Sequence, residues 1–119
     1  MDLFDSTQLG LAAAMRATAM RQTAIAQNLA NVNTPGYRRV KVDFEDTLRQ
    51  VIAGGDRERI AAFTPTMTTD AAAPVRADGS SVDVESEAAA QATNGLNYQA
   101  LAQIMRARID IVEQAIGGR

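Results

Sequence analysis

Residues 28–37 read Asn-Leu-Ala-Asn-Val-Asn-Thr-Pro-Gly-Tyr, and they separate a long helical pattern from a segment of different character. Asparagine side chains compete for backbone hydrogen bonds, so they favour helix ends and turns. Pro35 lacks an amide hydrogen and pushes Thr34 out of the helical region, whereas Gly36 permits a positive φ. The stretch therefore predicts that a helix ends near Asn31 and that a type II turn follows it.

The residues before this stretch predict one long helix over residues 5–31. Asp5 and Gln8 can form a capping box at its start, with Ser6 as an alternative N-cap. A heptad seam with spacings of four and three follows, and it consists of Leu11, Met15, Thr18, Gln22, Ile25, Leu29 and Val32. A line of alanines beside the seam would let a partner helix approach closely; these are Ala12, Ala19, Ala26 and Ala30. Such a thin apolar face does not stabilise a lone helix, so partners are expected.

A second long helix is predicted over residues 83–117, with Asp83 as its N-cap. Its apolar face consists of Tyr98, Leu101, Ile104, Met105, Ile109, Val112 and Ile116. Asn94-Gly95 is a weak point that permits a kink, because glycine costs about 1 kcal/mol relative to alanine in a helix. The two seams predict that the helices pair as an antiparallel coiled coil. The predicted packing interface is Leu11, Met15, Ile25, Leu29, Tyr98, Leu101, Met105, Ile109, Val112 and Ile116.

The middle of the chain has a different pattern. Alternating side chains over residues 37–44 predict an extended segment, and Asp43 is a candidate cap for a short helix over residues 44–53. Residues 54–82 show no lasting periodicity and are expected to form a flexible or partner-ordered loop with room for short extended pieces. The sequence thus predicts a mainly α fold with long terminal helices and a loop-rich middle, divided into segments 1–36, 37–82 and 83–119.

Composition excludes several kinds of function. The chain of 119 residues has a net charge of −2, which gives no charge argument for nucleic-acid binding. It contains no Cys and no His, so the commonest nucleophile activators and metal ligands are missing. Carboxylates cluster near residues 43–46 and 83–87 without a metal-loop spacing, and the basic cluster Arg38, Arg39 and Lys41 is interpreted as a solvated edge. No catalytic residue, cofactor or metal is expected, and an enzyme is not predicted.

Targeting signals are also missing from the pattern. The first residues are acidic where a secretory signal would be basic, and no segment approaches the roughly 20 apolar residues that span a bilayer. These signals alone predict a cytoplasmic protein without membrane insertion.

Residues 28–37 resemble the signature of the flagellar rod, hook and axial protein family, in which a helix near the N-terminus ends in an N-L-A-N-x-x-T-x-G-Y/F pattern. The matching residues are Asn28, Leu29, Ala30, Asn31, Thr34, Gly36 and Tyr37, with Pro35 inside the motif. The short chain and its ending from Val82 to Leu101 resemble proximal rod members, of which two subtypes remain alternatives.

The resemblance implies a structural, self-associating subunit of the bacterial flagellar basal body. It implies export through the flagellar type III apparatus without a cleaved signal peptide, in place of the cytoplasmic location. Implied partners are other rod subunits, the basal-body protein FliE, the membrane ring and the export apparatus. A helical-hairpin adaptor or secretion chaperone retained in the cytoplasm is the alternative from another class.

Overall fold

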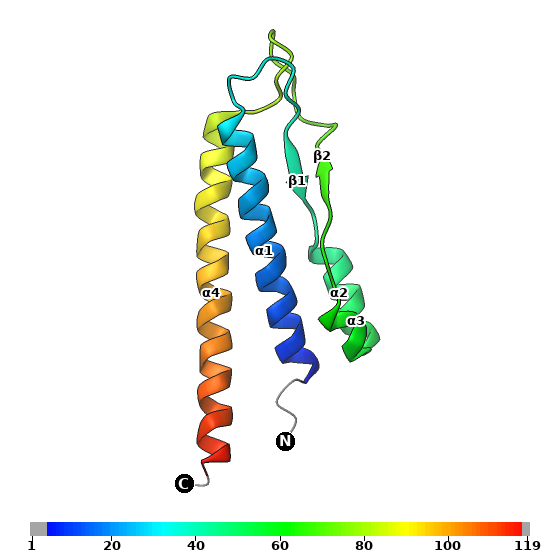
Figure 1. Cartoon of the computed structure of the whole chain (residues 1–119), viewed down its shortest axis with the longest axis vertical. Coiled ribbons are helices and arrows are strands. Elements are labelled where there is room, and N and C mark those ends of the chain that lie inside the picture. Colours follow the sequence, from blue (N-terminus) through cyan, green and yellow to red (C-terminus); the bar gives the residue numbers. More distant parts are fainter. Residues whose placement is uncertain (1–4, 118–119) are drawn as a thin grey trace.

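The computed structural model describes residues 5–117 and shows an elongated molecule with extents of 64 × 27 × 15 Å. Residues 1–4 and 118–119 of the predicted terminal segments lie outside the described residues. Three columns stand side by side, with α4 on one side of α1 and the strands and short helices on the other (Figure 1). In chain order the elements are α1 (Ser6–Ala30), β1 (Val40–Val42), α2 (Glu45–Gly54), α3 (Arg57–Ala61), β2 (Met67–Thr69) and α4 (Val84–Ile116). The prediction of a mainly α fold with long helices at both ends is confirmed.

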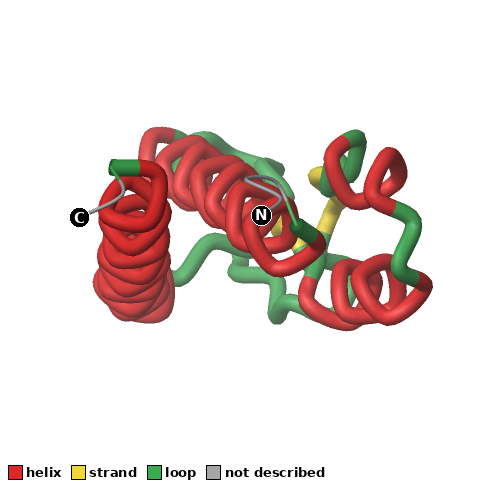
Figure 2. Tube along the Cα trace, turned by 90° about the horizontal axis from the view of Figure 1, so that it is seen from below, coloured by secondary structure: helices red, strands yellow, loops and turns green. Residues whose placement is uncertain are grey.

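Helix α1 is the central column, because other elements cover it on two sides (Figure 2). Asp5 caps it as predicted, with its carboxylate accepting a 2.8 Å hydrogen bond from the Gln8 amide. The Gln8 side chain does not complete the capping box, because it bonds to Met105 and Arg108 of α4. A β-carbon at Gly10 would lie 2.8 Å from Cδ1 of Ile52, so α2 approaches α1 closely at this point. The core on this side joins the helix to β1 and α2, and it consists of Ala13, Ala17, Ala24, Val42, Phe44 and Leu48.

The alanine line singled out in the sequence takes no part in this core. Ala19, Ala26 and Ala30 are exposed, and Ala12 is half-buried. The buried alanines belong to a neighbouring face of α1, which packs against β1 and α2. The alanine line therefore stays open to a partner outside the chain.

The middle region contains more regular structure than its sequence predicts. Strands β1 and β2 pair antiparallel, with Val40 opposite Thr69 and Val42 opposite Met67. The predicted cap at Asp43 is wrong: α2 begins one residue later, without a side-chain cap, and Asp43 instead forms an ion pair of 2.8 Å with Lys41. Gly55, at φ 73°, ends α2.

Helix α3 and strand β2 lie in the range for which a loop was expected. Asp56 caps α3 by accepting hydrogen bonds from the amides of Glu58 and Arg59. The guanidinium of Arg16 reaches from α1 to the other end of α3, donating to the carbonyls of Ala61 and Phe63 at 3.0 and 3.2 Å. The helix buries one apolar side chain, Ile60, completely. A single apolar residue in a run of charges gives no periodicity, so this helix was not predicted.

Helix α4 runs antiparallel to α1, and its C-terminal end extends beyond the start of α1 (Figure 1). Asp83 caps it as predicted, accepting from the amides of Glu85 and Ser86. Helix α4 continues through Asn94 and Gly95, and Figure 1 shows no bend along it. The side chain of Asn94 is buried and donates 2.9 Å hydrogen bonds to the Thr18 carbonyl and the Gln22 side chain. The two polar interruptions of the α1 seam thus face a polar residue of α4, which fixes the register of the pair.

Candidate functional site

The candidate site is the corner formed by residues 28–37, where the chain leaves α1 and turns back towards β1. The amide of Tyr37 donates a 3.2 Å hydrogen bond to the carbonyl of Thr34, and Gly36 has a φ of 77°. These features match the predicted type II turn, with Pro35 and Gly36 at its centre. The turn reverses the chain so that β1 runs back beside α1.

Asn28 joins the two sides of the corner. Its side chain is completely buried and pairs twice with the main chain of Val40: Nδ2 donates to the carbonyl, and Oδ1 accepts from the amide, both at 2.8 Å. The hydroxyl of Tyr37 donates to the same Oδ1 at 3.2 Å. An asparagine amide carries both a donor and an acceptor, so it can replace a neighbouring strand at this residue. Asn28 therefore anchors the start of β1 on the last turn of α1.

Asn31 and Thr34 close the end of the helix locally. Nδ2 of Asn31 donates to the carbonyl of Gln27 at 2.9 Å, and the Thr34 hydroxyl donates to Oδ1 of Asn31 at 3.2 Å. The carbonyl groups of a last helical turn lack partners within the helix, so these side chains satisfy part of that need. The two asparagines therefore have different roles. Asn28 joins two segments of the chain, and Asn31 bonds within the end of α1.

A second turn packs against the corner. Gly79, at φ 86°, lies so close that a β-carbon on it would be 3.2 Å from Cα of Gly36. The amide of Gly36 donates to the carbonyl of Asp78 at 2.9 Å. The segment that precedes α4 is thereby held against the segment that follows α1, so the corner sets where α4 begins.

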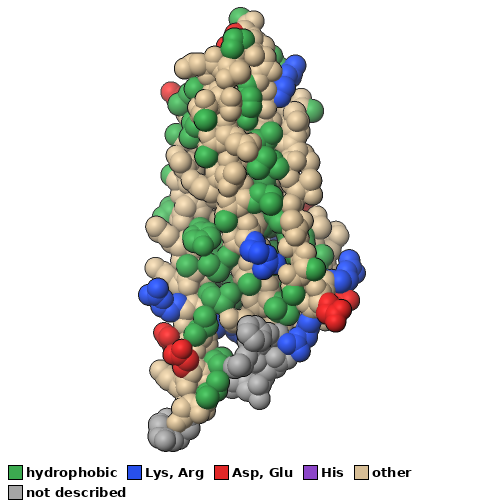
Figure 3. All heavy atoms as spheres, in the orientation of Figure 1, with side chains coloured by type: hydrophobic (Ala, Val, Ile, Leu, Met, Phe, Trp, Pro, Cys, Tyr) green, Lys and Arg blue, Asp and Glu red, His purple; other side chains and the backbone are tan. Residues whose placement is uncertain are grey.

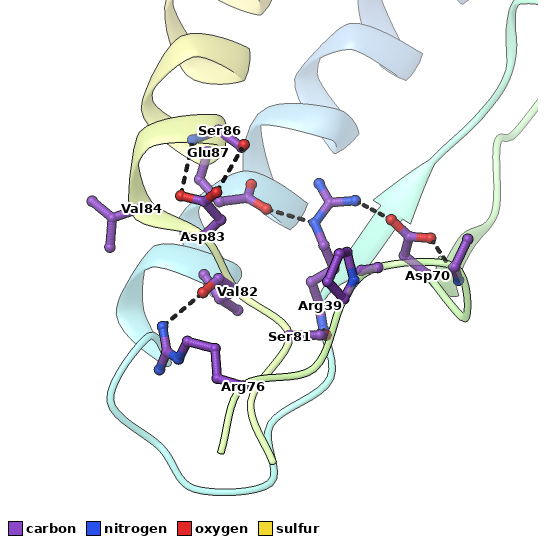
Figure 4. Close-up of a pocket in the computed structure, with 12 residues that line it drawn as sticks. Arg39, Asp70, Arg76, Ser81, Val82, Asp83, Val84, Ser86 and Glu87 are labelled. Carbon is purple, nitrogen blue, oxygen red and sulfur yellow. Dashed lines mark hydrogen bonds and ion pairs between the residues drawn. The ribbon is translucent and has the colours of Figure 1, made fainter. Parts of the chain in front are cut away.

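The guanidinium of Arg76 links the same two segments. It donates to the carbonyl of Val32 at 2.6 Å and to that of Val82 at 2.8 Å. Val32 ends the predicted α1 seam and Val82 lies just before α4. One side chain thus spans the gap between the end of one long helix and the start of the other. Figure 4 shows its contact with Val82.

Arg39 forms the charged centre of the region beside the corner. Its Nε donates to Glu87 of α4 at 2.6 Å, and its Nη1 pairs with Asp70 at the end of β2. Glu87 is buried, and its second oxygen has no hydrogen-bond partner in the described part of the chain. The interpretation of Arg39 as a solvated edge is wrong, because the arginine joins three elements of the fold (Figure 4).

Charges in this region shift several pKa values. Burial lowers the pKa of Arg39, but hydrogen bonds to Glu87 and Asp70 outweigh it, so the net pKa is raised. The hydrogen bond from Arg39 lowers the pKa of Asp70. Burial raises the pKa of the Tyr37 hydroxyl, and the negative charge of Glu87 adds to that effect. The raised pKa of Arg39 and the lowered pKa of Asp70 both favour the charged forms of the two groups, so these shifts stabilise their ion pair.

A cavity of about 650 Å³ lies between the start of α4 and the segment after β2. Charged side chains of both signs line it, including Arg39, Asp70, Arg76 and Glu87. No group of metal-binding side chains occurs within residues 5–117. In the same range, every helix is too short or too polar to cross a membrane.

The predicted helix-packing residues divide into three classes of exposure. Ile25 is buried in the interface. The half-buried members are Leu11, Met15, Leu29, Leu101, Met105 and Val112, and the exposed members are Tyr98, Ile109 and Ile116. The pairing therefore leaves much of its apolar surface in contact with solvent.

Polar contacts add to the apolar seam in holding α1 and α4 together. Besides Asn94, Arg108 donates to Asp5 at 3.0 Å and to Gln8 at 3.2 Å, which joins the far end of α4 to the start of α1. The sequence pattern did not predict the contacts made by Asn94, Arg39, Glu87 and Gly79. The pairing of polar interruptions in the two seams is the one local signal that could have identified Asn94.

Comparison with known proteins agrees with this geometry. The model of the family described as flagella basal body rod protein matches residues 11–38, which include α1 from Leu11 onward and the whole corner. FlgB of Bacillus subtilis is 29% identical over 127 residues, covering 99% of this chain and 98% of that protein. FlgB of Escherichia coli is 32% identical over 104 residues, covering 72% of this chain and 75% of its own length.

The chain belongs to the FlgB family of flagellar basal body rod proteins. FlgB of Borreliella burgdorferi is a more distant relative, at 24% identity over 104 residues. The sequence pattern had left FlgC, another proximal rod protein, as the alternative subtype. The relatives named here are all FlgB proteins, and their alignments extend into α4, well beyond the shared signature.

Proposed function

We propose that the chain is a structural subunit of the proximal rod of the bacterial flagellar basal body, where it polymerises into the rod that transmits torque. The observation that carries this function is membership of the FlgB family over almost the whole chain. The shape supports this function, because the seam between the two long antiparallel helices is partly exposed and neighbouring subunits would cover it.

The three segments have separate roles in this proposal. Segments 1–36 and 83–119 form the helical core of the rod, and segment 37–82 contacts neighbouring subunits. The corner residues Asn28 to Tyr37 set the angle between these parts, supported by the hydrogen bonds from Asn28 to Val40 and from Gly36 to Asp78. The half-buried and exposed residues of the α1–α4 seam are then covered on assembly.

The partners are other rod subunits, with FliE and the membrane ring nearby. The subunit reaches them through the flagellar type III export apparatus, without a cleaved signal peptide. Catalysis and a cofactor have no part in this function, because the relatives are named as rod components.

Cell fractionation tests this function against the adaptor or chaperone alternative. A tagged chain produced from its own locus is expected in purified basal bodies, with its N-terminus intact by mass spectrometry. A discrete dimer confined to the cytoplasm would contradict a rod subunit and support the alternative.

A further inference from the structure

Helix α4 carries a second apolar stripe that α1 does not cover. The residues Thr93, Leu96, Ala100, Ile104, Ala107 and Ile111 are all exposed and follow one another at spacings of three or four. The large members are notably open to solvent, with 68% exposure for Leu96, 49% for Ile104 and 62% for Ile111. Bulky apolar side chains in a continuous row on a helix are normally covered by another element.

Positions of the stripe lie 11 residues apart, although the residue types at these positions differ. Thr93 and Ile104 are related in this way, as are Leu96 and Ala107, and Ala100 and Ile111. An 11-residue repeat has about 3.67 residues per turn, close to the 3.6 of a straight α-helix, so the row keeps to one side of α4. None of these six residues is charged; the charged side chains Arg106, Asp110 and Glu113 lie outside the row. The stripe is thus a straight, neutral ridge.

A groove of about 500 Å³ lies between α1 and α4. Small side chains line it from α1, and they include Ala19, Thr23 and Ala26 of the exposed face that holds the alanine line. Its lining from α4 includes Gly95, Tyr98 and Gln99. The hydroxyl of Thr23 already donates to the Ala19 carbonyl at 3.3 Å, so a ligand need not satisfy it. The groove contains no charged residue, and Figure 3 shows hydrophobic side chains along α1 and α4 on one face of the molecule.

Ridge and groove face roughly opposite directions. At about 100° of rotation per residue, Tyr98 and Gly95 lie about 160° and 140° around α4 from the centre of the stripe, and Gln99 lies about 100° from it. A molecule that offers large apolar side chains on one side and an uncharged groove with small side chains on the other is complementary to a copy of itself. Such a contact joins two different surfaces, so it leaves one of each free and does not close.

We infer that the ridge of one subunit, from Thr93 to Ile111, docks into the α1–α4 groove of a second copy of the same chain. The inference rests on the proposed rod function and names the surfaces through which identical subunits meet. Each added copy presents a new groove and a new ridge, which makes the assembly open-ended.

Cysteine cross-linking tests the contact directly, because the chain contains no cysteine of its own. Two differently tagged copies are produced in one cell that lacks the untagged chain. One carries Thr23→Cys in the groove, and the other carries Leu96→Cys, Ile104→Cys or Ile111→Cys in turn, so that three positions of the ridge sample the register. Basal bodies are purified, oxidised and probed for a product that contains both tags.

A doubly tagged product is expected from at least one of the three pairs. The matched controls are Gln27→Cys, exposed on α1 outside the groove, and Arg106→Cys, exposed on α4 outside the ridge. A contact between copies is overturned if both tagged copies are present in basal bodies and no pair cross-links. It is also overturned if the controls cross-link equally, or if the ridge cysteines join only to a different protein. Absence of both copies from basal bodies would instead contradict the rod function itself.

A charge in the ridge provides a second measurement. Ile104→Lys is expected to reduce incorporation into basal bodies at least about tenfold, because docking would bury an unpaired ammonium group. Gln103→Lys, at the neighbouring exposed position, should have little effect. Circular dichroism of the free chain checks that Ile104→Lys keeps the helix content of the parent. Equal incorporation of the two variants would contradict the inference.

Discussion

The side chain of Asn28 and the main chain of Val40 form two hydrogen bonds of 2.8 Å, one in each direction. This contact joins the last turn of α1 to the first residue of β1 across the corner. The family motif thus has a structural explanation: an amide at this position satisfies a strand that has no neighbour on that side. Replacement of the amide should therefore affect the whole corner.

Asn28→Ala should lower the free energy of unfolding by about 3 kcal/mol, because it leaves two polar groups of the Val40 main chain without partners. Asn28→Asp retains the acceptor but places an oxygen against the Val40 carbonyl, so it should also destabilise the protein. Urea unfolding followed by circular dichroism measures both. The control is Asn33→Ala, an exposed residue of the same motif, which should stay within about 0.5 kcal/mol of the parent. A loss at Asn28 no larger than at Asn33 would show that the bonds to Val40 contribute little.

Gly79→Ala should destabilise the protein more than Gly55→Ala. Both glycines have a positive φ, 86° and 73°, so alanine at either position costs about 1–2 kcal/mol in backbone conformation. Only at Gly79 would the new methyl group also meet a neighbour, 3.2 Å from Cα of Gly36, whereas Gly55 has no atom within 4 Å. The difference between the two urea midpoints isolates the packing of one turn on the other. Equal midpoints would mean that the close packing of Gly79 on Gly36 contributes nothing measurable to the stability of the protein.

Arg39→Ala should cost about 3 kcal/mol of stability, because the buried carboxylate of Glu87 loses its charged partner. The neighbouring Arg38 is exposed, and Arg38→Ala is the matched control. The double variant with Met at positions 39 and 87 should recover part of the loss, since it removes the buried charge as well as its partner. Thermal unfolding of all four proteins gives the comparison. Similar melting temperatures for the Arg38 and Arg39 variants would show that the contacts of Arg39 do not stabilise the fold.

Stability should fall in acid through the ion pair of Arg21 and Glu45. Hydrogen bonds from Arg21 hold the pKa of Glu45 at about 2, below its ordinary value of 4.5. A carboxylate with a lowered folded pKa adds stability above its unfolded pKa, and that stability disappears as the pH falls from about 4.5 through about 2. Asp70, whose pKa is also lowered by Arg39, contributes in the same direction.

Urea midpoints measured from pH 2 to pH 7 test this dependence. Glu45→Gln should flatten part of the acid-side slope relative to the parent. Since about half of the Glu45 side chain is exposed, the effect is modest at high salt. Parallel curves for the parent and Glu45→Gln would rule out this pair as a source of acid sensitivity.

Local chemistry predicted the parts of the fold that depend on neighbours in sequence. Asp5 and Asp83 cap their helices, and Gly36 takes the positive φ of a type II turn, because the groups involved lie within a few residues. Asn94 and Glu87 were not identified, since their partners lie 76 and 48 residues away. A buried Glu in the first turn of a helix has the same sequence pattern as a solvated one, and only the distant Arg39 distinguishes them.

The candidate site follows the same division. The motif defined the boundaries of the site, residues 28–37, but it did not predict which other residues hold the corner in place. Val40, Asp78, Gly79 and Arg76 complete the corner, and three of these four lie in the range expected to be a loop. Their roles depend on which segments the fold brings together.

Imaging of basal bodies from a strain that lacks the gene tests the rod function most directly. Electron microscopy should show basal bodies without a complete rod, and production of the parent chain should restore it. Complementation with Gly36→Val should fail to restore the rod, while the free variant keeps most of its helix content. Intact rods in the deletion strain would contradict the assignment of this chain to the flagellar rod.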